Sequence, residues 1–245
     1  MKYVLKILLI ILPIGLAAQD AVLGENTTVY QYEYKLGAQL NSFGWAIHGK
    51  LGQYQGAKNR AQLGFTFAVL KHPKEIKSFN PYYEDAKGYF YGKLNSVMLL
   101  KPVVGIERLL SEKYRESGVQ ISYSAHVGPS FGLVKPVYLE IGLPKFPYEY
   151  IEVQRYNPNE HSIDDIYGRA SFVHGFDKLK LAYGIHATAG INFEYSDASD
   201  GIKGLSVGVM VDAFTKKIPI MAFSDNKQIF AGFYIALFYG RKYVR

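Results

Sequence analysis

The residues best suited to nucleophilic chemistry lie in the segment 118–141. His126 shares alternate positions of this segment with three serines: Ser122, Ser124 and Ser130. In an extended strand these side chains point to one face, so a serine hydroxyl and a histidine base can meet there. An acid such as Glu140 would supply the third member. Since such residues more commonly pack together in a polar network, catalysis is the alternative interpretation and packing the preferred one.

Candidate metal ligands gather in a polar stretch further along the chain: Glu160, His161, Asp164, Asp165 and His174. Carboxylate and imidazole groups can bind divalent metal ions. The two aspartates, however, directly follow Ser162-Ile163, and the residues up to Gly175 include apolar positions at helical spacing: Ile166, Tyr167, Ala170 and Val173. A serine cap followed by acids is typical of the first turn of a helix. We therefore predict one short amphipathic helix here and no metal.

A third group of charged and imidazole residues recurs at alternate positions of several segments: Glu33, Lys35, His48, Lys50, His126, His186, Glu194 and Asp212. If these side chains all point into the same interior, they form a cluster of positive and negative charges. Such a cluster can bind a small ligand or a metal. Because buried charges must be paired, the preferred interpretation is that these acids and bases neutralise one another.

Strict alternation of apolar and polar residues indicates which elements position these groups. In the segment 179–195, alternate positions are apolar or aromatic, whereas the positions between them include Lys180, His186 and Glu194. This period of two is typical of β-strands with different surroundings on their two faces. The sequence predicts eight strands, within the segments 29–40, 45–51, 60–70, 88–110, 118–141, 179–195, 202–213 and 228–242.

The connections between these strands differ in length in a regular way. The segments 71–87, 142–178 and 214–227 are long, and they fall on the same side of an up-and-down sheet. The segments 88–110 and 118–141 exceed the nine to eleven or so residues that cross a bilayer, so we expect this hairpin to project beyond the others. A ten-stranded alternative would divide them near Lys101-Pro102 and Gly128-Pro129.

The first residues have the features of an export signal. Met1–Ala18 contains Lys2 and Lys6, an apolar run, and then small residues, and it is too short to anchor the chain as a helix. We expect cleavage after Ala17 or Ala18 and a single mature domain over residues 19–245. Loss of the two lysines lowers the net charge from +7 to about +5.

The final segment, QIFAGFYIALFYGRK from Gln228 to Lys242, is apolar or aromatic on one face and contains small and aromatic residues on the other. It resembles the last strand of small bacterial outer-membrane β-barrels, which closes the sheet against the first strand. The Ala-Gln junction after the signal and the aromatic-Gly-basic ending are similar to barrels of the Bacteroidota type. The resemblance implies an all-β transmembrane antiparallel barrel in the outer membrane of a Gram-negative cell, with long outer loops.

Function is predicted from architecture, because the resemblance brings no catalytic motif. An eight-stranded barrel is filled by side chains, which argues against a pore. We predict a non-enzymatic interaction component without a cofactor, acting as a subunit of a larger secretion or protein-assembly machine. The expected contacts are lipopolysaccharide and a protein or lipoprotein partner, because no basic stripe suggests nucleic acid. A lipid A-modifying enzyme and a ligand-binding barrel are the alternatives. The predicted interface residues are Phe146, Tyr148, Tyr150, Tyr167, Ile218, Ile220 and Met221.

Overall fold

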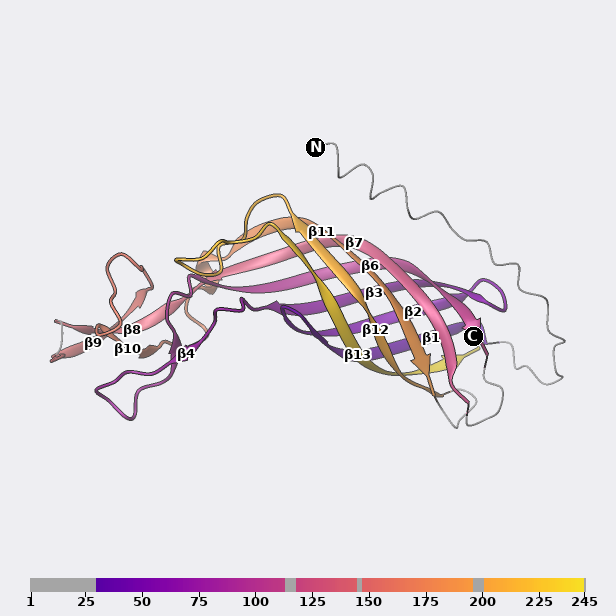
Figure 1. The fold of residues 1–245 in the computed structure, drawn as a ribbon, viewed down its shortest axis with the longest axis horizontal. Coiled ribbons are helices and arrows are strands. Elements are labelled where there is room, and N and C mark those ends of the chain that lie inside the picture. The colour runs from indigo at the N-terminus through magenta and orange to yellow at the C-terminus, as the bar shows by residue number, and fades with distance from the viewer. Residues whose placement is uncertain (1–29, 113–117, 145–146, 196–200, 245) are drawn as a thin grey trace.

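The computed structural model describes residues 30–112, 118–144, 147–195 and 201–244 (Figure 1). The predicted signal peptide, residues 1–18, and Phe146 lie outside the described residues. In the part of the chain that is described, no helix is both long and apolar enough to cross a membrane.

Eight long antiparallel strands close into a barrel in the order β1-β13-β12-β11-β7-β6-β3-β2. The predicted closure is confirmed: β13 pairs with β1 over ten residue pairs, from Tyr32 opposite Tyr243 to Asn41 opposite Tyr234. The barrel strands are β1 (Tyr32–Asn41), β2 (Gly44–Tyr54), β3 (Asn59–Leu70), β6 (Asn95–Ser111), β7 (Gln120–Pro136), β11 (Lys180–Glu194), β12 (Gly201–Phe214) and β13 (Ile229–Tyr243).

The count is eight rather than ten because β6 and β7 run uninterrupted through their prolines. The β6–β7 ladder passes from Leu100 opposite Phe131 to Val104 opposite Val127, and the prolines fall within this gap in the pairing. Gly128 lies directly against the carbonyl of Pro102, where a β-carbon would collide with it. The glycine therefore lets the two strands stay together where proline removes a ladder donor.

The predicted alternation is confirmed by burial along the barrel strands. Outward residues such as Ile185 on β11 and Phe233 on β13 are 63% and 72% exposed. The residues directly before and after each of them in the strand face inward and are less exposed. The outside of the barrel is therefore an apolar band, whereas the inside holds the charged residues. This is the two-sided character expected of a strand with hydrocarbon on one face and a packed lumen on the other.

The interior changes character along the barrel axis. Near the long loops it is an apolar cluster: Ala46, Ala68, Leu70, Val97, Leu99, Val134, Phe214, Ile218, Ile220, Met221 and Phe230. Toward the end that holds the start of β1 and the end of β13, the buried side chains are charged, among them Glu33, Arg60 and Glu107. One strand, β6, therefore turns both apolar and charged residues inward, which obscures its pattern in the sequence.

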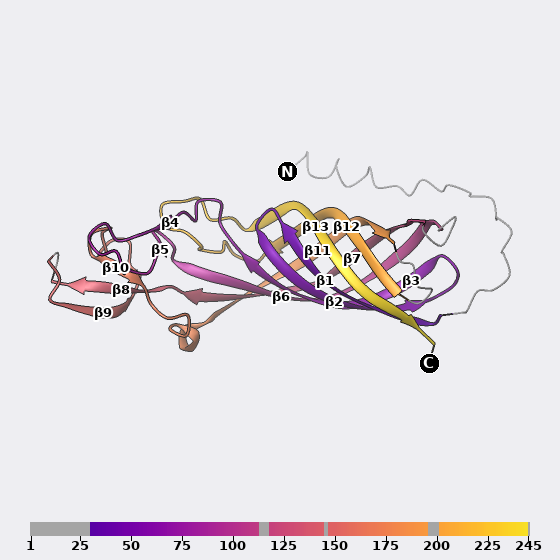
Figure 2. The ribbon, with the colours of Figure 1, turned by 90° about the horizontal axis from the view of Figure 1, so that it is seen from below.

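The chain beyond β3 and β7 builds a second body, here called the projecting module and formed by residues 71–94, 137–144 and 147–178 (Figures 1 and 2). A three-stranded sheet has the order β10-β8-β9, and β4 pairs with β5. Tyr89, Leu139, Ile141, Tyr156 and Ile166 form its core. Its strands are β4 (Lys77–Ser78), β5 (Tyr89–Phe90), β8 (Tyr138–Leu143), β9 (Tyr150–Arg155) and β10 (Ile166–Arg169).

The projecting module explains two differences from the predicted strands. Each long segment is divided: 88–110 contains β5 and β6, and 118–141 contains β7 and β8. Pro136 ends β7, and the next residue, Val137, accepts a hydrogen bond from the Tyr156 N–H inside the module. The hairpin projects as predicted, but its ends pair within a separate sheet instead of lengthening the barrel.

The sequence predicts a helix after Ser162, but the structure has a single turn there, followed by strand β10. The Ser162 N–H and hydroxyl both donate to the Asp165 carboxylate, at 3.0 and 2.7 Å, and this closes a single turn. Ile166 then enters β10, where it is fully buried against β8. Burial of Ile166 in the module core favours a strand over the helix that local spacing suggested. The short helical turn, η1 (Phe176–Lys178), follows Gly175 instead.

Candidate functional site

Charged side chains from five strands, β1, β3, β6, β11 and β13, meet at the end of the lumen away from the long loops and form what is here called the lumen ion network. The Lys35 ammonium lies 3.0 Å from the Glu33 carboxylate and 2.8 Å from that of Glu107. The Arg60 guanidinium contacts the same two carboxylates at 3.2 Å each. Glu194 contacts Lys242 at 2.8 Å. Glu33, Lys35 and Glu194 of the predicted cluster are therefore paired with groups of opposite charge.

Neutral groups complete this network. The Gln62 amide donates to Glu107 at 2.5 Å, and the Ser122 hydroxyl donates to Glu107 at 2.7 Å. The Tyr54 hydroxyl donates to Glu33 at 3.0 Å. Each carboxylate therefore accepts several hydrogen bonds, which offsets the cost of removing its charge from water.

A second, smaller cluster lies further along the lumen. Asp212 is completely buried and accepts hydrogen bonds from Lys101 and His186, both at 2.9 Å. Ser130 also donates to Asp212, at 3.4 Å. The strands β6, β7, β11 and β12 supply these four residues, so the cluster ties together side chains from half of the barrel.

The catalytic arrangement considered for His126 is not formed. Its Nε2 lies 2.7 Å from the Gln62 side-chain oxygen, whereas the Ser122 and Ser130 hydroxyls donate to carboxylates. Glu140 lies on β8, in the projecting module. Ser124 is buried, and its hydroxyl has no hydrogen-bond partner among the described residues. No described serine is therefore positioned for His126 to deprotonate.

Ser130 stands in a run that matches the G-x-S-x-G pattern, Gly128-Pro129-Ser130-Phe131-Gly132. In hydrolases that pattern places serine on an exposed turn between a strand and a helix. Here β7 continues straight through it, and Ser130 is fully buried. The motif therefore forms no nucleophile turn here, and its glycines allow close packing between strands.

One small cavity lies inside the lumen. His48, Lys50 and His186 line an internal cavity of about 30 Å³, which has room for one or two water-sized molecules. Lys50 lies opposite Lys35 in the β1–β2 ladder. The Nδ1 atom of His48 has no hydrogen-bond partner among the described residues. A cavity of this size suits water and excludes an organic substrate.

No group of three or more potential metal ligands occurs among the described residues. In the loop set considered earlier, Asp165 binds the Ser162 N–H and hydroxyl, and the Asp164 carboxylate accepts from the Tyr82 hydroxyl. His161 contacts the Asn157 N–H and the Gln154 side chain. These side chains stabilise turns of the projecting module.

Sequence reasoning missed the partners that organise the lumen. Arg60, Gln62, Lys101 and Glu107 belong to the clusters but were not among the predicted residues. Strand β3 carried a usable signal, because Arg60 and Gln62 occupy the positions between its outward apolar residues. Strand β6 carried a weaker one, since its inward positions include Val97, Leu99 and Val103 as well as the charged residues.

The predicted interface residues divide into two groups. Ile218, Ile220 and Met221 are buried at 1%, 1% and 5% exposure in the apolar cluster that fills the barrel mouth. Their proposed role as surface anchors is therefore corrected, because the β12–β13 loop folds back over its own barrel. Tyr148 and Tyr167 pack against Tyr83 inside the projecting module.

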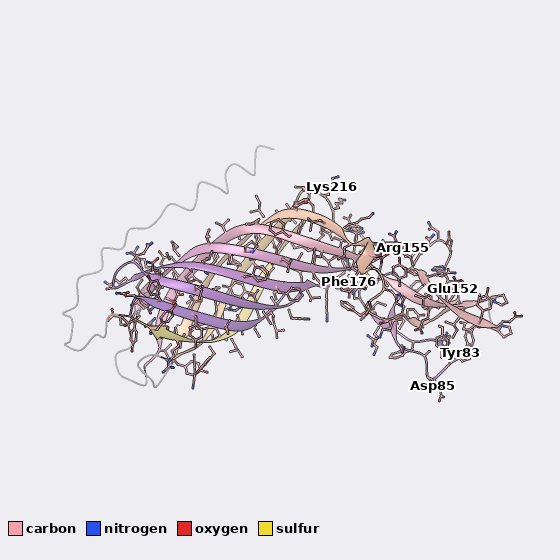
Figure 3. The ribbon with its side chains drawn as sticks, turned by 180° about the vertical axis from the view of Figure 1, so that it is seen from behind. Tyr83, Asp85, Glu152, Arg155, Phe176 and Lys216 are labelled. Atoms are coloured by element: carbon pink, nitrogen blue, oxygen red, sulfur yellow. The ribbon has the colours of Figure 1, made fainter. Side chains whose placement is uncertain are left out.

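Tyr150 is the first residue of β9, the most exposed strand of the projecting module. Within the described residues β9 pairs with β8 alone, so its second edge has no neighbouring strand. Tyr150, Ile151 and Val153 are exposed. Figure 3 shows Glu152 of this strand far out on the module and Arg155 closer to the barrel.

Comparisons with known proteins add likenesses of structure. No protein-family model and no curated protein matches the sequence. The N-terminal β-barrel domain of OprF from Pseudomonas aeruginosa is 8% identical, with a TM-score of 0.40 over 87% of this chain and 98% of that one. Neisserial surface protein A (NspA) is 9% identical, with a TM-score of 0.40 over 87% and 95%. Ail, the attachment invasion locus protein of Yersinia pestis, is 9% identical in its complex with a heparin analogue, with a TM-score of 0.39 over 87% and 96%.

Proposed function

We propose that this chain is a non-enzymatic outer-membrane β-barrel that displays the projecting module outside the cell for binding a partner protein. The observation that carries the proposal is the free edge of β9 on a sheet held away from the barrel. The partner is an outer-membrane protein or lipoprotein, in a larger secretion or protein-assembly machine. The filled lumen supports a role for the barrel as an anchor.

Membrane insertion is supported by the outer face of the barrel. Apolar side chains from every barrel strand are exposed there, including Leu36, Leu63 and Val209. A closed sheet satisfies its backbone hydrogen bonds internally, as the hydrocarbon core requires. The long connections lie at one end of the barrel and the short ones at the other, which matches outer loops and periplasmic turns.

Val209→Arg tests this placement. Val209 is 47% exposed on the outer face of β12, opposite Phe233 of β13. In lipid vesicles the substitution is expected to lower the free energy of unfolding by about 2–4 kcal/mol, because arginine is costly near the bilayer midplane. Unfolding by urea can be followed through the fluorescence of the single tryptophan, Trp45, on the outer face of β2.

The matched control is Thr215→Arg, which adds the same charge at an exposed position just after β12. It should leave stability within about 0.5 kcal/mol of the parent protein. Equal stability of the Val209→Arg variant and the parent in vesicles would contradict membrane insertion, as would a product that stays soluble without detergent.

The β9 edge suits an extended partner segment. Antiparallel strands direct the backbone groups of successive residues alternately toward and away from a neighbour. The Tyr156 N–H points toward the β8 side, where it donates to Val137, so the groups of Ile151 and Val153 point to the free edge. A partner strand could therefore add to the sheet through backbone hydrogen bonds and cover the exposed apolar side chains.

Val153→Pro should weaken partner capture at least tenfold, because proline removes an outward N–H and leaves the β8 ladder intact. Co-purification from outer membranes in mild detergent, with quantitative mass spectrometry, measures the effect. Val153→Ala keeps the N–H and should retain most of the partner. Equal recovery of every co-purifying protein with the proline variant would count against strand addition.

A further inference from the structure

A cavity of about 480 Å³ lies where the projecting module meets the rim of the barrel. Its charged lining residues are all cationic: Lys87, Lys93, Lys135 and Arg169. They come from β7, from β10, from the loop before β5 and from the segment between β5 and β6, so the cavity forms only when the module packs against the barrel. Its size falls within the range of small-molecule sites, and it is separate from the lumen clusters.

Lys135 provides the sharpest indication of what this cavity binds. The residue is only 4% exposed, and its ammonium donates to the carbonyls of Phe172 and His174 at 3.0 and 2.9 Å. No carboxylate among the described residues forms an ion pair with it. The ammonium also lies 4.5 and 5.3 Å from the ring centroids of Phe172 and Phe176, so every partner it has is neutral. A buried ammonium with only neutral partners is suited to an anionic ligand.

The four cationic lining residues outnumber the carboxylates that pair with them, so the cavity carries a net positive charge. Lys93 is neutralised by Glu75 at 2.5 Å, and Lys87 lies 3.8 Å from Glu140. Arg169 is exposed and forms no ion pair among the described residues. Neither Glu75 nor Glu140 lines the cavity. Lys135 and Arg169 are thus the lining cations without a carboxylate partner among the described residues, and ammonium and guanidinium groups both favour a phosphate.

The uncharged part of the lining suits a sugar ring. Phe90, Tyr138 and Phe172 contribute aromatic surface, and Ser96 and Ser171 contribute hydroxyl groups. The Lys93 and Lys135 ammonium groups lie 4.9 and 4.5 Å from the ring centroids of Phe90 and Phe172, so Tyr138 is the ring without a lysine over it. Aromatic faces can cover the apolar side of a sugar, while serine hydroxyls can bond to its hydroxyls. A bare phosphate would leave most of a 480 Å³ cavity unfilled.

We propose that this cavity binds a phosphorylated saccharide, with the phosphate on Lys135 and Arg169 and the sugar ring against the aromatic residues. The proposal goes beyond partner binding and does not depend on the β9 edge. A phosphorylated saccharide can be free or can be the headgroup of lipopolysaccharide in the surrounding membrane. The site lies on the loop side of the barrel rim, where either source has access.

The test uses the full-length protein in detergent, titrated calorimetrically with glucosamine 1-phosphate, glucosamine and inorganic phosphate. A second arm measures binding of the protein in nanodiscs to lipopolysaccharide, with phosphatidylcholine nanodiscs as the blank. Lys135→Met and Arg169→Gln should each weaken binding at least tenfold. Lys216→Gln removes the charge of an exposed lysine that does not line the cavity and should change binding less than twofold.

Glucosamine 1-phosphate binding that both cavity variants weaken supports the proposal with a free ligand. Lipopolysaccharide binding with the same response supports it with a membrane ligand. Because Lys135 also holds the loop at Phe172, the exposed Arg169 provides the variant that leaves folding intact. The proposal is overturned if neither arm shows binding, if Arg169→Gln binds like the parent, or if inorganic phosphate binds as tightly as the sugar phosphate.

Discussion

Replacing Glu107 with alanine is expected to lower the free energy of unfolding of the barrel by about 3–5 kcal/mol. The Glu107 carboxylate is 3% exposed and accepts hydrogen bonds from Lys35, Arg60, Gln62 and Ser122. Without it, Lys35 keeps only Glu33, and Arg60 keeps Glu33 and the more distant Glu194 at 3.9 Å. The Ser122 hydroxyl loses its carboxylate acceptor, and the Gln62 amide keeps only a 3.4 Å bond to Glu33. Urea unfolding in vesicles, followed by Trp45 fluorescence, measures the loss.

Glu112→Ala is the matched control for this experiment. Glu112 follows β6 and is exposed, so its removal should change stability by no more than about 0.5 kcal/mol. A loss below about 1 kcal/mol for the Glu107→Ala variant would show that the lumen is hydrated enough to screen these charges. The lumen ion network would then be a solvated cluster rather than a buried one.

The second large effect is expected at Lys101 and Asp212, which are 2% and 0% exposed and lie 2.9 Å apart. Asp212→Ala leaves the Lys101 ammonium buried without a carboxylate, and Lys101→Met leaves the Asp212 carboxylate with only the hydrogen bonds from His186 and Ser130. Each single change should cost about 3–5 kcal/mol in the same unfolding assay.

The double variant Lys101→Met with Asp212→Leu should cost about 1 kcal/mol or less, because apolar groups of similar volume replace both charges. The mouth-side neighbours of this pair include the apolar Leu99 and Phe214, which favours such a replacement. A cost equal to the sum of the two single changes would mean that the residues act independently. Lys203→Met, at an exposed position of β12, controls for loss of a lysine.

These two experiments examine the barrel as an anchor, whereas the β9 and cavity experiments examine what it displays. The separation follows from the structure: the lumen clusters are closed off by the apolar cluster at the barrel mouth, and the projecting module lies beyond it. A variant that weakens the lumen should therefore reduce the amount of folded protein without changing ligand or partner selectivity.

Most of the barrel could be predicted from the sequence because each side chain of a barrel strand meets one of two media. In β11, Leu181 and Ile185 face outward while His186 and Glu194 face inward, and this period of two is visible without knowledge of any neighbour. The polar composition of the long connections likewise predicts that they are exposed to solvent. Strand number, facing and closure by the last strand therefore follow from local pattern.

The contacts themselves were decided by tertiary structure. Arg60 and Glu107 are 47 residues apart, and Lys101 and Asp212 are 111 apart, so their pairing depends on the register of strands that the local sequence does not specify. Ile166 enters a strand and Ile218 fills the barrel mouth for the same reason: apolar burial depends on what the rest of the chain leaves uncovered. Local sequence determined which medium each residue meets, and only the closed fold determined which partner it finds there.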